Sequence, residues 1–191
     1  MKFLIDRIRQ IIRVSESEEK ILQDLFIEKQ LSKGDHFLAE NQVCRWLGLI
    51  HRGLVRYYIN VDGEDKTYYF GKEGDFVCDY ESFLPQKASN KNIQVLEDTS
   101  LYTISHQGLQ HIYDHLKEGD RFGRLGIEQV FVNILQQLTS FYNDPPELRY
   151  QHFLDAYPEI SQRVPQYYIA SYVGIKPQSL SRIRNRSIKK H

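Results

Sequence analysis

The sequence predicts an α+β protein in which a small antiparallel β-domain lies between helical segments. Three observations predict this class. Apolar residues recur at helical spacing in residues 1–28, short β-prone runs alternate with turn residues from 30 to 105, and helical spacing returns after residue 107. A chain of 191 residues is long enough for one large domain or two small ones.

Charge and hydropathy argue against a membrane-spanning or secreted protein. The 25 basic and 25 acidic side chains cancel, but the basic residues concentrate at the C-terminus and the acidic residues between 62 and 81. A local basic face counts for more in nucleic-acid binding than the total charge. No run is apolar enough to span a bilayer, and charges follow Met1 too early for a secretory signal. Cys44 and Cys78 lack metal-ligand spacing, so we expect two reduced thiols in a cytoplasmic protein and no metal site.

The first 28 residues are predicted to be helical. Apolar residues recur there at helical spacing, namely Ile5, Ile8, Ile11 and Ile12. Ser15 and Ser17, followed by glutamates, have the pattern of a helix N-cap before the apolar residues of 21–26.

The middle of the chain predicts a small antiparallel barrel or sandwich. Glycines at 34, 53, 63 and 74 mark turns between short runs rich in β-branched and aromatic residues. Residues 54–70 form a predicted hairpin with its tip at 61–64. Residues 93–96 and 100–104 are the expected closing strands.

Helical periodicity returns with a short helix at Leu109, Ile112 and Leu116, and a long helix follows from about 120 to 141. The long helix carries apolar residues that step by four, three, four and three, namely Ile127, Phe131, Ile134, Leu138 and Phe141. This stripe is typical of a helix that packs lengthwise on another helix, as in a dimer. The alternative is an amphipathic helix that packs on its own domain. Prolines at 145 and 146 start a further helix, which places a domain boundary near residue 143.

The last 29 residues, from Arg163 to His191, contain seven basic residues and no acidic residue. A short apolar helix at 169–173 leads to Gly174 and then to a second helix that begins at Pro177. Ala170 is the small residue expected where two such helices cross. The pattern predicts a helix-turn-helix that binds DNA, and a helical hairpin buried in a core is the alternative.

The order of these segments resembles the Crp/Fnr (cyclic AMP receptor-like) transcription regulators from about residue 20 to the end. The β-roll of that family is matched at Lys33-Gly34, at Ile50-His51-Arg52-Gly53-Leu54-Val55-Arg56, at Asp62-Gly63, at Phe70 with Glu73-Gly74-Asp75-Phe76, and at Leu96-Glu97-Asp98-Thr99-Ser100-Leu101-Tyr102-Thr103-Ile104-Ser105.

The resemblance implies a cyclic-nucleotide-binding-like sensor domain with N-terminal helices at 1–119. It implies a dimerisation helix at 120–142 and a winged-helix-like helix-turn-helix domain at 143–191. It further implies a homodimer on double-stranded DNA, with RNA polymerase as a further partner. The chain stops soon after Arg186, so the wing is expected to be short or missing.

The second helix of the motif supplies the expected DNA contacts, which are Lys176, Pro177, Gln178, Ser179, Ser181, Arg182, Arg184 and Arg186. Gln178, Ser179 and Arg182 fall on one side and are expected to contact base edges. The other basic residues are expected to contact phosphates. Lys189 and Lys190 share that basic character, but we expect them to form a solvated tail.

The expected effector pocket departs from the cyclic-AMP-binding members of the family. Cys78-Asp79 stands where those members have a Gly-Glu pair, and residues 86–92 contain no arginine to hold a cyclic phosphate. We therefore expect no response to cyclic AMP and assign no cofactor. The expected lining residues are Gly74, Asp75, Phe76, Asp79, Tyr80, Glu81, Ser82, Ser89 and Lys91. The N-terminus has no cysteine for the iron–sulfur centre of the oxygen-sensing members.

The sequence leaves two alternatives to a transcription regulator. One is a cyclic-nucleotide-binding regulatory module that acts through protein partners, against which the basic C-terminus argues. The other is an enzyme, which we do not expect because no nucleophile–base pair or metal-ligand constellation is present.

Overall fold

Two helices precede the first strand in the computed structural model, which describes residues 1–188. Helix α1 (Lys2–Arg9) buries Leu4, Ile5 and Ile8, and α2 (Glu16–Leu25) follows a short non-helical segment. The Ser15 hydroxyl accepts a hydrogen bond from the Glu18 N–H while the Glu18 carboxylate accepts one from the Ser15 N–H. This reciprocal capping box confirms the predicted helix start.

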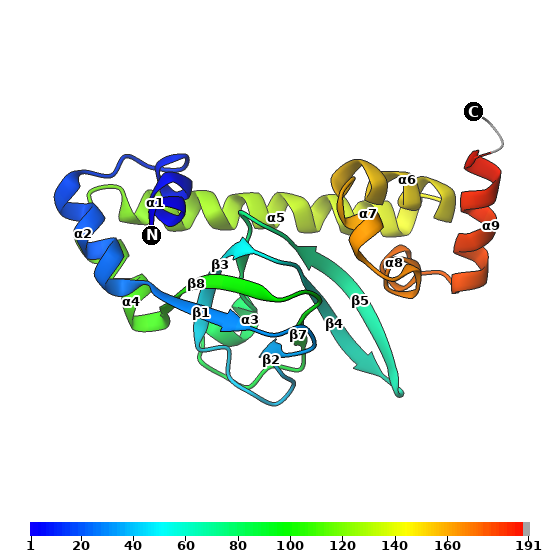
Figure 1. Ribbon diagram of the computed structural model, residues 1–191, viewed down its shortest axis with the longest axis horizontal. Coiled ribbons are helices and arrows are strands. Elements are labelled where there is room, and N and C mark those ends of the chain that lie inside the picture. Colours follow the sequence, from blue (N-terminus) through cyan, green and yellow to red (C-terminus); the bar gives the residue numbers. More distant parts are fainter. Residues whose placement is uncertain (189–191) are drawn as a thin grey trace. The chain divides into compact units, whose positions relative to one another are not determined.

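The β-roll consists of two four-stranded sheets (Figure 1). The first has the order β1 (Ile27–Leu31), β8 (Thr99–Ser105), β3 (Trp46–Arg52) and β6 (Phe76–Val77). The second has the order β2 (His36–Leu38), β7 (Asn92–Val95), β4 (Val55–Val61) and β5 (Glu64–Gly71). Antiparallel pairing sets Leu49 opposite Tyr102 and Gly48 opposite Val77. The predicted antiparallel β-domain is therefore confirmed.

The interior of the roll is apolar, and β3 and β8 are buried along most of their length. Leu49, Ile50, Phe70, Ile93 and Ile104 are fully buried. The predicted hairpin turns at Asp62 and Gly63, both with positive φ, as a tight two-residue turn requires.

Helix α3 (Tyr80–Phe83) follows β6, α4 (His106–His115) follows β8, and α5 (Gly119–Asn143) follows α4. Helix α5 is the long helix predicted for 120–141 and runs without a break for 25 residues (Figure 1). Only Gly119 and Phe122 of this helix are buried. All five residues of the apolar stripe are exposed.

The C-terminal segment forms α6 (Pro146–Ala156), α7 (Ile160–Arg163), α8 (Gln166–Val173) and α9 (Pro177–Ile188). Its core contains Phe153, Ile160, Ile169, Ala170 and Leu180, all nearly inaccessible to solvent. Within residues 1–188, no helix is long and apolar enough to cross a membrane.

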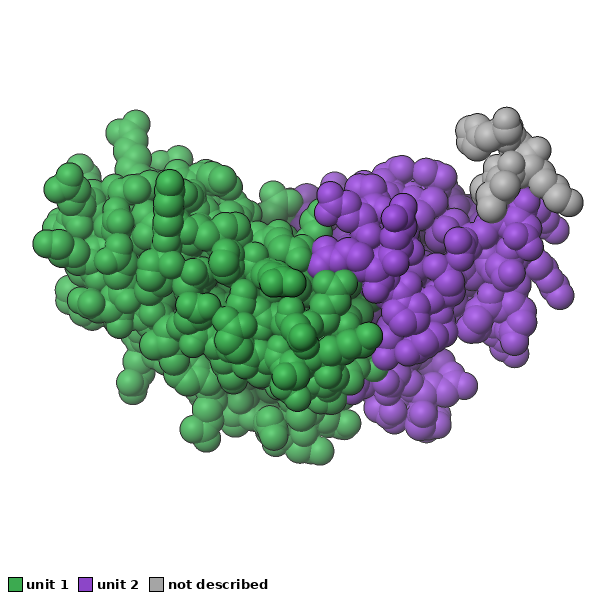
Figure 2. Space-filling view, viewed as in Figure 1, with its two compact units in different colours: residues 1–57, 70–130 green, residues 58–69, 131–191 purple. Residues whose placement is uncertain are grey.

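Contacts between Cα atoms divide the chain into two compact units (Figure 2). Unit 1 comprises Met1–Tyr57 and Phe70–Val130, and unit 2 comprises Tyr58–Tyr69 and Phe131–His191. The outer part of the β4–β5 hairpin thus belongs to the same unit as the C-terminal helices.

Candidate nucleic-acid interface and effector loop

Helices α8 and α9 meet at a glycine turn whose geometry requires glycine. Gly174 ends α8 in the left-handed region, with φ of +75°. A Cβ atom there would lie 3.0 Å from the Phe141 ring, so a larger residue meets both strain and crowding. The Ile175 N–H donates to the Ala170 carbonyl at 2.9 Å, which closes the end of α8.

Helix α9 begins at Pro177, as the sequence predicted, and its two faces differ. Leu180 and Ile183 are buried against the rest of unit 2. Gln178 and Arg182 lie exposed on the other face, and Ser179 is half-buried. This is the division expected of a helix that packs on one side and contacts a partner on the other.

The exposed face of α9 is basic. Of the predicted DNA contacts, Lys176, Pro177, Ser181 and Arg186 are exposed and Arg184 is half-buried. Residues 163–188 contain no carboxylate side chain. Among the side chains that the structure describes, none makes a hydrogen bond or ion pair with Arg182 or Arg186. Lys189 and Lys190 lie outside the described residues.

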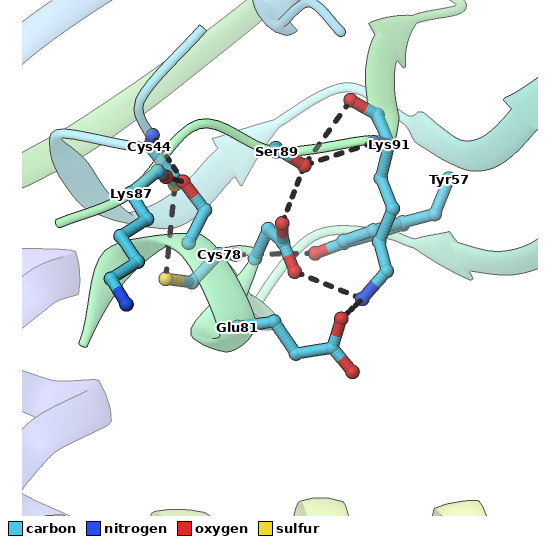
Figure 3. A network of polar contacts seen from close by, with 9 residues as sticks. Cys44, Tyr57, Cys78, Glu81, Lys87, Ser89 and Lys91 are labelled. Atoms are coloured by element: carbon cyan, nitrogen blue, oxygen red, sulfur yellow. Dashed lines mark hydrogen bonds and ion pairs between the residues drawn. The ribbon is translucent and has the colours of Figure 1, made fainter. Parts of the chain in front are cut away.

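Four of the predicted effector residues form one polar network around Asp79, which is 5% exposed. The other three, Glu81, Ser89 and Lys91, are labelled in Figure 3. The Ser89 hydroxyl donates to Asp79 Oδ2 at 2.6 Å, and Lys91 Nζ lies 3.2 Å from Asp79 Oδ1. Lys91 Nζ also binds Glu81 Oε2 at 2.8 Å, so its side chain links the two carboxylates. We call the segment that carries these four residues, 79–91, the effector loop.

The charges of this network are already paired inside the protein. Burial opposes a charge on Lys91, but its hydrogen bond to Glu81 and the nearby Asp79 carboxylate outweigh burial and raise the pKa of Lys91. One ammonium between two carboxylates leaves a formal charge of minus one. An anionic ligand would therefore have to displace a carboxylate from Lys91.

The other predicted pocket residues have different partners. Gly74 accepts a 2.8 Å hydrogen bond from Arg7 Nε, and Asp75 Oδ2 accepts one from the Lys72 N–H, so both belong to the β5–β6 turn. Burial raises the pKa of Asp75. Phe76 packs edge-on against Phe122, with 5.7 Å between the ring centroids.

Tyr80 and Ser82 lie on α3, at the start of the effector loop. Burial raises the pKa of the half-buried Tyr80. Ser82 is buried, and its hydroxyl donates to the Lys87 carbonyl at 2.5 Å.

Comparison with known proteins agrees with this architecture. Residues 28–116 match the family described as cyclic nucleotide-binding domain. The solved structure of FixK2 from Bradyrhizobium japonicum is similar, with 14% identity, a TM-score of 0.77, and 87% of this chain and 86% of that chain covered. A protein from Eubacterium rectale, described as a transcriptional regulator of the Crp/Fnr family, has 17% identity, a TM-score of 0.70, and coverage of 92% and 85%. The chain has the Crp/Fnr fold.

A third solved structure is also similar to this chain. It is CLP from Xanthomonas campestris, described as a global regulator that responds to c-di-GMP, with 12% identity, a TM-score of 0.72, and coverage of 92% of this chain and 93% of that one. No curated protein sequence matches this chain. The fold that the resemblance implied is therefore confirmed.

Sequence reasoning missed that the β4–β5 hairpin of this Crp/Fnr fold contacts the helix-turn-helix. The Thr67 N–H donates to Ser171 Oγ at 2.8 Å, and that hydroxyl donates to the Asp65 carbonyl at 3.2 Å. A hollow of about 990 Å³ lies between the hairpin and the two helices; its lining includes Glu64, Lys66, Tyr167, Lys176, Gln178 and Ser179. Ion pairing with Lys66, and more weakly the charge of Lys176, lowers the pKa of Glu64. The acidic tip therefore lies beside the start of α9.

Two further features of the roll were not predicted. Arg56 is 3% exposed within β4 and donates from Nε to Gln94 Oε1 at 3.0 Å. Cys44 and Cys78, distant in sequence, lie side by side. Both features depend on which strands pair in the roll. Local sequence patterns do not predict that pairing. Among the described residues no group of three or more histidine, cysteine or acidic side chains could hold a metal ion.

Proposed function

We propose that this chain is a sequence-specific, DNA-binding transcription regulator of the Crp/Fnr type that acts as a homodimer in the cytoplasm, with RNA polymerase as a further partner. The observation that carries the proposal is the exposed face of α9, which presents Gln178 and Arg182 beyond a glycine turn. Arginine can bind guanine O6 and N7 with two hydrogen bonds, and glutamine can bind adenine N6 and N7. The absence of carboxylates from residues 163–188 favours a polyanionic partner.

The apolar stripe of α5 supports the homodimer. Its members Ile127, Phe131, Ile134, Leu138 and Phe141 are 42%, 59%, 55%, 51% and 56% exposed. So long an apolar face on one helix is costly in water unless a partner covers it. A second copy fits because heptad steps match a coiled coil and because a two-fold dimer matches two operator half-sites.

The effector of this regulator is proposed to be something other than cyclic AMP. Asp79 and Glu81 already bind Lys91, the one ammonium in the network described above. A cyclic phosphate would meet a site of net negative charge and would need to break those ion pairs. Calorimetry with cyclic AMP and cyclic GMP tests this point: no heat is expected, and micromolar binding of either would contradict it.

The DNA-binding proposal is tested by selecting bound sequences from a random duplex library with the purified chain. Arg182→Ala should weaken binding to the selected sequence by about 1–3 kcal/mol and relax the preference at one base position. Arg186→Ala should weaken binding to all sequences and reduce the salt slope by about 1. The matched control is Arg45→Ala, an exposed arginine of unit 1, which should leave affinity unchanged.

The possible outcomes separate the proposal from its alternative. Enrichment of one sequence that depends on Arg182 supports the regulator. Binding that ignores sequence and survives Arg182→Ala contradicts it. Absence of DNA binding together with micromolar affinity for a cyclic nucleotide would instead favour a module that acts through protein partners.

A further inference from the structure

The two cysteines of the chain lie against each other inside unit 1 (Figure 3). Cys44 Sγ and Cys78 Sγ are 4.0 Å apart although 34 residues separate them in sequence. Their side chains are buried, with Cys44 3% and Cys78 8% exposed. The antiparallel pairing of β3 with β6, which sets Gly48 opposite Val77, brings the two segments together.

The two sulfur atoms have different environments. A hydrogen bond from the Cys78 thiol and another from the Asp79 N–H lower the pKa of Cys44, against the opposing effects of burial and of the Asp79 charge. Burial raises the pKa of Cys78. Cys44 therefore holds the sulfur that ionises first, and Cys78 holds a protonated thiol in contact with it. This asymmetry matches an attacking thiolate beside a resolving thiol.

We propose that Cys44 and Cys78 form a peroxide-oxidisable dithiol that closes to an intramolecular disulfide. The Cys44 thiolate attacks one oxygen of hydrogen peroxide, so that an S–O bond forms, the O–O bond breaks, and the leaving hydroxide takes a proton and departs as water. The Cys78 sulfur then attacks the sulfur of the Cys44 sulfenic acid. The S–S bond forms, the S–O bond breaks, and the hydroxyl group leaves with the Cys78 proton as a second water. Two electrons pass from the thiols to the peroxide.

Formation of this disulfide should move both the Cys44 segment and the Cys78 segment, and each of them contacts the effector loop. The sulfur atoms must approach from 4.0 Å to the bond length of about 2 Å. The Cys44 N–H donates to the Ser82 hydroxyl at 2.8 Å, so movement of Cys44 pulls on α3. Cys78 directly precedes Asp79, and its N–H donates to the Tyr57 hydroxyl at 3.3 Å. Oxidation is therefore expected to loosen the contacts of Asp79 with Ser89 and Lys91.

The pair is tested by treating the reduced, folded full-length chain with hydrogen peroxide and measuring its intact mass. The expected result is a loss of about 2 Da that dithiothreitol reverses, with the chain still monomeric on a denaturing gel without reductant. Peptide mapping should join the peptides that contain Cys44 and Cys78. Hydrogen exchange should then be faster at the Lys91 amide, which donates to Ser89 Oγ at 2.9 Å in the reduced protein.

Matched serine variants separate the two roles. In Cys78→Ser, the Cys44 sulfenic acid should persist and react with dimedone, whereas Cys44→Ser should show much less labelling of Cys78. The proposal is overturned if the folded wild-type chain keeps both thiols, or if only links between copies form. Unchanged exchange at Lys91 in the oxidised chain would refute the link to the effector loop. The mass measurement uses the wild-type chain and does not depend on the folding of either variant.

Discussion

The main-chain N–H of Thr67 donates a 2.8 Å hydrogen bond to the hydroxyl of Ser171. One partner lies on β5 and the other on the first helix of the helix-turn-helix. Two neighbouring residues of the same strand add to this contact. The Tyr68 carbonyl accepts a hydrogen bond from Gln137 Nε2 at 2.5 Å, and the Tyr69 ring meets the Tyr157 ring edge-on at 6.5 Å. Three successive residues of β5 thus attach the hairpin to α8, to α5 and to the end of α6.

Ser171→Ala is expected to loosen this attachment. Thr67 is 3% exposed, so its N–H would lose its partner in a buried position, at a cost of about 1–3 kcal/mol. Urea unfolding should report a loss of this size, and hydrogen exchange should become faster at the Thr67 amide. Ser181→Ala is the control, because Ser181 is exposed on α9. Equal stability of the two variants would contradict the proposed role of the Ser171 hydroxyl.

Leu138→Glu is expected to dissociate the homodimer. Leu138 is 51% exposed in the single chain and lies within the apolar stripe. Each copy would lose an apolar contact of about 1.5–3 kcal/mol and would bring a charge to the interface. The dissociation constant should rise at least ~100-fold, which sedimentation velocity can measure.

The control for this change is Gln136→Glu, which adds the same charge at an exposed position of α5 outside the stripe. It should leave the dimer intact. A wild-type chain that remains monomeric at high concentration, or a Leu138→Glu dimer as tight as the wild type, would show that the stripe does not form the interface.

Asp79→Ala is expected to destabilise unit 1. The change leaves the Ser89 hydroxyl without its carboxylate acceptor and leaves Lys91, which is 20% exposed, with Glu81 alone. Breaking a fully buried ion pair costs about 3–5 kcal/mol, and partial solvent access to Lys91 reduces the expected loss to ~2 kcal/mol.

Glu81→Ala is the matched control for Asp79→Ala. Glu81 binds the same lysine, but its side chain is 79% exposed, so its loss should cost less than ~1 kcal/mol in urea unfolding. If both changes had the same small effect, Asp79 would not be the centre of the network.

Local patterns predicted the elements of this fold better than they predicted the site. The Ser15 cap, the turn at Asp62-Gly63, the stripe of α5 and the start of α9 at Pro177 depend on residues close in sequence, and the structure contains each of them. The contact of Thr67 with Ser171 joins residues 104 apart. Such contacts arise from strand pairing and helix packing, which hydrophobic periodicity does not encode.

The contacts of the effector loop were likewise not predictable from local sequence patterns. The sequence indicated that Asp79, Ser89 and Lys91 line one pocket, but not that Lys91 forms ion pairs with Asp79 and Glu81 there. The short α3 was also not predicted, because four residues are too few to show a helical period. Cys44 and Cys78 had no recognisable spacing, and only the pairing of β3 with β6 makes them neighbours.

The capping box of α2 should make the free energy of unfolding depend on pH in the acidic range. The Ser15 N–H and hydroxyl donate to Glu18 Oε2 at 2.8 and 2.7 Å, and the Lys117 N–H donates to Glu18 Oε1 at 2.8 Å. These bonds, with the Ser15 N–H first, lower the pKa of Glu18 below its usual 4.5. Because the folded-state pKa is depressed, the contribution is present above pH 4.5 and is lost as pH falls through the folded value.

Glu18→Gln removes this contribution, because an amide cannot accept hydrogen bonds at both of its terminal atoms. The expected loss at neutral pH is less than ~1 kcal/mol, since the carboxylate is largely solvated. Urea unfolding at several pH values should show the difference from wild type shrinking below pH 4.5. Glu16→Gln removes the same charge from the first turn of α2, where Glu16 is exposed, and corrects for the helix dipole. A Glu18→Gln deficit that stays constant into acid would mean that the ionised carboxylate is not what the capping box requires.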